Sequence, residues 1–158
     1  MVQLHIITVG ALSATFKDAV AEYEKRLCAF CSVNNINIKE VKINDEDNRS
    51  QIQSALSEEA DKIIAKMPQD AYKIALCVEG VQKDSLALAE VLREACDTKG
   101  KICLVIGSSH GLDERVKAKC DLRLSVSKLT FPHQLMRVIL LESLYRSFAI
   151  INGRKYHK

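Results

Sequence analysis

The polar residues of this chain that could do chemistry gather near its end. His133 and Arg137 lie four positions apart, so on a helix they would share one face. Both follow a loop expected at residues 127–131, where a strand would end. A histidine and an arginine beside such a loop could contact a ligand, but an interfacial histidine bonded to a carbonyl explains the pattern equally well. From the residues alone, both interpretations stay open.

The last thirteen residues of the chain carry cations and no acidic side chain. Arginine and lysine can hold phosphate groups, and a tyrosine ring offers a face on which an unpaired base can stack. The net charge of +3 is too small to predict nucleic-acid binding by itself. Without further information, a solvated cationic end is the plainer interpretation. The polar residues of this segment are Arg146, Arg154, Lys155, Tyr156, His157 and Lys158.

Six cysteines are a second source of possible chemistry. Cys28 and Cys31 have the spacing of a redox or metal pair, but they fall at the end of a helical pattern. The turn that lowers a thiol pKa joins a strand to a helix instead. We therefore expect no metal site and no redox role here.

The elements that must position these residues belong to one domain, residues 1–158, with 47% hydrophobic residues. The N-terminus lacks the segments of a signal peptide, and no apolar run approaches the roughly 20 residues that span a bilayer. These observations predict a cytoplasmic protein with no membrane partner.

Strand-like apolar runs alternate with helical patterns along the chain. This alternation predicts an α/β fold with a mainly parallel sheet of five or six strands, flanked by helices. Ligands of such sheets bind where the carboxyl ends of the strands open into loops. The strands are expected near residues 4–9, 33–43, 72–78, 102–106 and 122–126, and the candidate exits are residues 79–80, 107–111 and 127–131.

The final helix, expected to begin at Pro132, is apolar on almost every side. Ten of the seventeen positions from His133 to Ala149 are apolar and leave no broad polar face. The helix is therefore either a central core helix or the interface of a homodimer. We favour the homodimer, because the terminal element of a small domain is seldom enclosed by its own chain.

Three C-terminal segments together resemble the bacterial 23S ribosomal RNA (pseudouridine-N3)-methyltransferases. They are Ser127–Arg137 (SKLTFPHQLMR), Glu142–Arg146 (ESLYR) and Tyr156–Lys158 (YHK). That family is a minimal member of the SPOUT class, in which the C-terminal segment threads a trefoil knot around S-adenosylmethionine. The resemblance covers the whole chain, and it implies a C-terminal knot that the ordinary rules of chain topology would exclude.

The resemblance also implies an activity and its site. The expected reaction is S-adenosylmethionine-dependent methylation of N3 of a pseudouridine in 23S ribosomal RNA, on assembled ribosomes. The expected contacts of the methyl donor are Leu76, Gly107, Val126, Ser127, Lys128, Leu129, Thr130 and Phe131. The residues expected around the target nucleotide are His133, Arg137, Arg146, Tyr156, His157 and Lys158. The general base is either His157 or bulk water, and the tail of one subunit is expected over the cofactor loop of the other.

One position departs from the family pattern, because Ser108 follows Gly107 where the family commonly has two glycines. If residue 108 needs a positive φ, serine there is strained by about 1 kcal/mol and cofactor affinity falls. Two other functions are alternatives to the main one. One is a non-catalytic nucleotide-binding or ribosome-associated module, and the other is a SPOUT enzyme that acts on transfer RNA.

Overall fold

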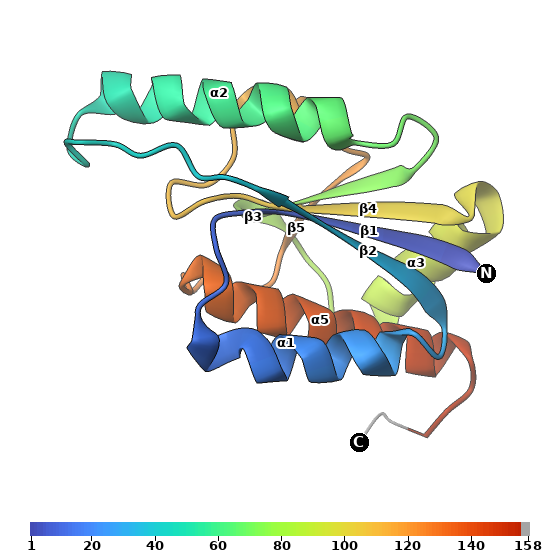
Figure 1. Ribbon diagram of the computed structural model, residues 1–158. Helices are drawn as coiled ribbons and strands as arrows, with labels where there is room; N and C mark the ends of the chain where they lie inside the picture. Colours follow the sequence, from blue (N-terminus) through green and yellow to red (C-terminus); the bar gives the residue numbers. More distant parts are fainter. Residues whose placement is uncertain (156–158) are drawn as a thin grey trace.

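The computed structural model describes residues 1–155, in which strands and helices alternate as expected (Figure 1). The strands are β1 Val2–Val9, β2 Cys31–Ile38, β3 Tyr72–Gln82, β4 Lys101–Ile106 and β5 Leu122–Ser125. The helices are α1 Ala14–Leu27, α2 Arg49–Lys66, α3 Ser85–Lys99, α4 Glu114–Ala118 and α5 His133–Ile151.

The five strands form one sheet in the order β2-β1-β4-β3-β5, and every neighbouring pair is parallel. The expected parallel sheet is therefore confirmed. Ile102–Ile106 is buried throughout and lies in β4 at the centre of the sheet. Because all strands run in one direction, their carboxyl ends open at the same edge.

Helices cover both faces of the sheet (Figure 1). Successive side chains of a strand point to opposite faces, so Ile6 and Ile7 enter different core clusters. The cluster that contains Ile6 includes residues of α1, α3 and α5. The cluster that contains Ile7 includes residues of α2 and α4. The α2 side therefore forms a layer separate from the one that holds the C-terminal helix.

Two local expectations were wrong. Strand β2 ends at Ile38, so residues 39–43 form an irregular segment rather than its continuation. Strand β3 runs on to Gln82, with a shift in its pairing to β5 between Leu76 and Val81.

The two interpretations of α5 each describe one part of it. The helix packs beside α1 and α3, and its buried residues all lie in its second part. They are Leu140, Leu141, Leu144, Ser147, Phe148 and Ala149. Residues 133–139 are only half-buried. The second part is therefore a core helix, and the first part is incompletely covered by its own chain. The C-terminal knot stays a prediction.

Gly100 ends α3 and offers a test of the fold that does not touch the ligand edge. Its φ is +63°, and its N–H donates to the Cys96 carbonyl at 3.0 Å. A Cβ there would meet no atom within 4 Å, so Gly100→Ala costs only backbone strain. We expect a loss of about 1 kcal/mol in the free energy of unfolding, measured with urea. Lys99→Ala is the control and should cost less, and equal losses would contradict this account.

Candidate functional site

A cavity of about 180 Å³ lies at the exits of β4 and β5 and beside the part of β3 where its pairing with β5 shifts. Nine of its sixteen lining residues have apolar side chains, and the others are Gly107, four serines, Thr130 and His133. Such a combination suits an organic ligand of mixed polarity. The lining residues are Leu76, Cys77, Val78, Ile106, Gly107, Ser108, Ser109, Leu124, Ser125, Val126, Ser127, Leu129, Thr130, Phe131, His133 and Met136.

Seven of the eight residues expected to contact the methyl donor line this one cavity. They are Leu76, Gly107, Val126, Ser127, Leu129, Thr130 and Phe131. Lys128 is exposed and is not part of the lining. As contacts of a cofactor all eight stay predictions. The loops after β4 and β5 meet at the cavity as expected, but residues 79–80, the first expected exit, are not in its lining, and β3 contributes Leu76, Cys77 and Val78 instead.

The loop after β4 forms one wall of the cavity and requires glycine at position 107. A Cβ on Gly107 would lie 2.2 Å from the carbonyl oxygen of Gly111, because the loop folds back on itself. The N–H of Gly111 donates to the Ser108 carbonyl at 2.9 Å, and Gly111 has a φ of +86°. The reason for a small residue is therefore close approach within the chain.

Ser108 is free of the strain considered from the sequence. Within residues 1–155, only glycines have a positive φ. The left-handed position of this loop falls on Gly111, and Ser108 pairs with it in a short antiparallel bridge. The condition for strained serine is not met, so the lower cofactor affinity inferred from it no longer follows.

Hydrogen bonds of two serines shape the wall of the cavity that the end of β5 and the following loop form. The Ser125 hydroxyl donates to the Ser127 carbonyl at 2.9 Å, and the Ser127 hydroxyl accepts the Leu129 N–H at 3.0 Å. The second bond turns the chain sharply, and it leaves the Leu129 side chain 69% exposed at the cavity. An apolar side chain at this place is available to a ligand or a partner.

His133 and Arg137 lie together at the start of α5. His133 lines the cavity and also a smaller hollow that contains Gly10 and Arg137. The Arg137 guanidinium donates to Thr8 Oγ1 at 3.4 Å and lies 3.5 Å from Glu24 Oε1. Among residues 1–155 its buried Nε has no hydrogen-bond partner. The arginine is therefore held by long contacts and keeps donor capacity.

Arg146, the other described candidate for the nucleotide site, is not at the cavity. Arg146 is thirteen residues after His133, about 20 Å along the axis of α5, and pairs with Glu142 at 2.7 Å. Arg154 lies at the far end of the helix, with its guanidinium 4.6 Å from the centre of the Phe30 ring. Tyr156, His157 and Lys158 lie outside the described residues.

The cysteines do not form a reactive pair. Cys31 is buried, and burial raises the pKa of its thiol to about 12. A thiol that resists ionisation is a poor nucleophile and a poor metal ligand. Within residues 1–155, no three His, Cys, Asp or Glu side chains are grouped to hold a metal ion. No described helix has the length and apolar character needed to cross a membrane.

Sequence reasoning missed several lining residues, and some of them left a signal. Met136 is one helical turn after His133, so a site at His133 would include it. Cys77 and Val78 directly follow Leu76 in β3. The ends of β4 and β5 also line the cavity, with Ile106, Leu124 and Ser125. Ser109 belongs to the loop at residues 107–111, which was already a candidate.

Comparisons with known proteins agree on one family. Residues 2–157 match the family model described as a predicted SPOUT methyltransferase. The ribosomal RNA large subunit methyltransferase H of Caldicellulosiruptor bescii is 42% identical over 156 residues, covering 98% of this chain and 99% of that protein. The protein of that name from Bacillus pumilus is 40% identical over 157 residues, with 98% and 99% covered. A solved structure, a probable methylase family protein from Haemophilus influenzae Rd KW20, matches 100% of this chain and 72% of its own with a TM-score of 0.55. At 13% identity that match is evidence of fold alone.

Proposed function

Because the chain belongs to the SPOUT methyltransferase family, we propose that it transfers a methyl group from S-adenosylmethionine to N3 of a pseudouridine in 23S ribosomal RNA. The proposed substrate is the assembled ribosome in the cytoplasm. The names of relatives about 40% identical over nearly the whole chain support the ribosomal substrate. The cavity lined by β3 and by the loops after β4 and β5 is the observation that supports the proposed binding site of the methyl donor.

The residues of this cavity fit the methyl donor. Apolar side chains such as Leu76, Val126 and Phe131 can enclose an adenine ring, while main-chain groups beside Gly107 can bond its polar atoms. When bound, S-adenosylmethionine supplies a methyl group on a sulfonium centre, so the reactive group is the cofactor's own. The protein's contribution is to orient the methyl donor and the target base, because the walls fix the direction in which the base can approach.

The start of α5 is where we propose that the target nucleotide binds. His133 borders both the cavity and the hollow with Arg137, so a base held there is beside the methyl donor. The Arg137 guanidinium has an unpaired buried Nε among the described residues and can hold a phosphate or a base oxygen. The N3 proton of the base leaves to His157 or to water, as expected from the sequence.

A homodimer is the proposed state of the active enzyme. Apolar side chains remain exposed, including Val78 and Leu129 in the lining of the cavity, Val81 in β3 and Leu86 in α3. Residues 133–139 of α5 are also only half-buried, and His133 and Met136 among them line the cavity. A second subunit packed on this surface would bring its own cationic tail toward the cavity. We expect a dimer at micromolar concentration in analytical ultracentrifugation, and a monomer would contradict this assembly.

A radiolabelled methyl-transfer assay tests the activity. Ribosomes that lack the modification should gain label from S-adenosylmethionine in the presence of the protein, and digestion should place the label on pseudouridine. Free ribosomal RNA and transfer RNA are the controls. Binding to ribosomes without transfer of label would instead favour the non-catalytic module. Label on transfer RNA alone would favour the other class of SPOUT enzyme.

A further inference from the structure

A buried carboxylate lies outside the cavity but contacts its wall. Glu59 is on α2, is 3% exposed, and accepts the Val41 N–H at 3.0 Å. The Ser108 side chain lies beside the same carboxyl group and lowers its pKa. Val41 belongs to the segment after β2, and Ser108 to the loop after β4. One side chain therefore joins a helix to the loops of two strand exits.

This burial is costly and has no compensating ion pair. Burial raises the pKa of Glu59, and Glu40 raises it further, whereas the bond from Val41, the Ser108 side chain and the charge of His110 lower it. None of the ion pairs between residues 1–155 includes Glu59. An apolar residue would fill this place without that cost, so packing alone does not explain a carboxylate.

Ser108 connects Glu59 to the proposed methyl-donor site. Ser108 is 6% exposed, lines the cavity, and accepts the Gly111 N–H through its carbonyl. Holding its hydroxyl therefore fixes the loop from Gly107 to Gly111 from behind. A glycine at position 108 would offer Glu59 only its main chain, so the side-chain link belongs to this sequence.

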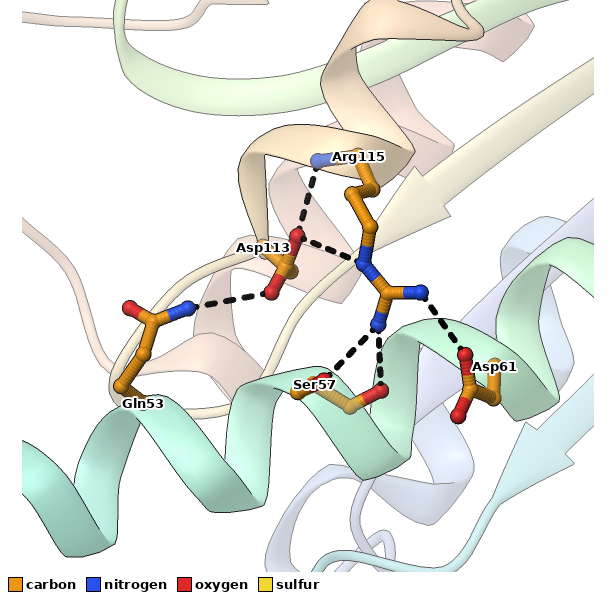
Figure 2. Close-up of polar contacts among 5 residues, drawn as sticks. All are labelled: Gln53, Ser57, Asp61, Asp113 and Arg115. Carbon is orange, nitrogen blue, oxygen red and sulfur yellow. Dashed lines mark hydrogen bonds and ion pairs between the residues drawn. The ribbon is translucent and has the colours of Figure 1, made fainter.

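A second set of bonds attaches the end of the same loop to α2 (Figure 2). Gln53 donates to Asp113 Oδ2 at 3.2 Å, while the Arg115 guanidinium contacts Asp61 at 2.8 Å and Ser57 at 2.8 and 2.9 Å. These bonds fix where the loop enters α4, mainly through exposed groups. Glu59 is the buried link at the start of the loop, next to the cavity.

We propose that Glu59 is a positioning residue of the methyl-donor site, acting through Ser108 on the loop from Gly107 to Gly111. The inference rests on the proposed function, because it assigns Glu59 to the cavity in which S-adenosylmethionine would bind. Glu59 does not line that cavity and contacts the wall only from outside.

Four single variants test the proposal: Glu59→Ala, Glu59→Gln, Ser108→Ala and the control Glu58→Ala. Glu58 is the neighbouring residue of α2 but is exposed and pairs only with Lys62. The dissociation constant of S-adenosylmethionine is measured by isothermal titration, and methyl-transfer kinetics and thermal unfolding are measured in parallel. We expect Glu59→Ala and Ser108→Ala to weaken binding about ten-fold, since each leaves a buried polar group without its partner. Glu59→Gln should rescue most of the affinity, because glutamine can bond both Val41 and Ser108.

The kinetic signature separates positioning from a structural role. In the Ser108→Ala variant the KM for S-adenosylmethionine should rise while kcat at saturating cofactor stays near wild type. The double variant Glu59→Ala with Ser108→Ala should bind no worse than the weaker single variant, because the residues act as one unit. If Glu59→Ala does not fold, Ser108→Ala still decides the outcome.

Wild-type affinity in Ser108→Ala would overturn the inference even if the unfolding temperature fell. An equal loss of affinity in Glu58→Ala would also overturn it. Failure of the proposed function gives a different result, because the wild-type protein itself would then not bind S-adenosylmethionine.

Discussion

Replacing Gly107 by alanine is expected to abolish S-adenosylmethionine binding and methyl transfer. The new Cβ would lie 2.2 Å from the Gly111 carbonyl oxygen, 2.6 Å from its carbon and 2.9 Å from Leu112 Cγ. Main-chain atoms at such distances must move, so the loop from Gly107 to Gly111 has to open, and the wall that it forms in the cavity is lost. We expect a fall in affinity of about 100-fold or more and a loss of stability of about 1–3 kcal/mol. Isothermal titration and urea unfolding measure the two effects.

Gly111→Ala is the matched control for this experiment. Gly111 has a φ of +86°, but a Cβ there would meet no atom within 4 Å. That variant therefore carries the backbone strain of about 1 kcal/mol without the collision. It should retain most of its affinity for the cofactor. Wild-type affinity in the Gly107→Ala protein would show that the loop does not form the wall we propose.

Deleting residues 154–158 is expected to abolish ribosome methylation and leave cofactor binding nearly intact. The deletion removes the cationic tail, which follows α5 at the end away from the cavity. The methyl donor's proposed walls remain complete, whereas the proposed contacts to RNA are lost. We expect a loss of transfer of at least about 100-fold, since binding energy far from the reacting atoms positions the substrate. Methyl-transfer assays and titration with S-adenosylmethionine measure the two properties separately.

Arg154→Ala is the control for the deletion. Arg154 lies over the Phe30 ring, so its removal alone tests whether the loss comes from this contact within the chain. A strong loss in that variant would assign the effect to packing at Phe30. Unchanged methylation in the deleted protein would exclude a role for the tail.

The sequence predicted the parallel sheet and the edge at which the cavity lies. The apolar run Ile102–Ile106 is enough to identify a central strand, because only a strand covered on both faces is so continuously apolar. From parallel strands it follows that loops far apart in sequence meet at one edge. The choice of Leu76, Gly107 and Val126 within this edge came from the family resemblance, and all three line the cavity.

Other features depend on distances that no local pattern encodes. The reason for Gly107 is the return of the chain at Gly111, a contact set by the conformation of the loop. Arg146 and His133 belong to one helix, but only the position of the cavity shows that it includes His133 and does not extend to Arg146. Glu59 did leave a signal, since it is four residues from both Ala55 and Ile63 on the buried side of α2. A carboxylate in that stripe calls for partners, but the sequence does not identify Val41 and Ser108.

The length of α5 has a consequence for how activity is distributed between subunits. The helix holds His133 beside the cavity at one end, and residues 154–158 follow its other end, so in the proposed dimer the cavity and the tail of one chain would belong to two different sites. In the proposed dimer each complete site then combines halves from both chains. A pair made of one subunit with a damaged cavity and one with a shortened tail would still contain one intact site. Two subunits with the same defect would contain no intact site. Activity would therefore depend on the combination of subunits in the dimer and not on either subunit alone.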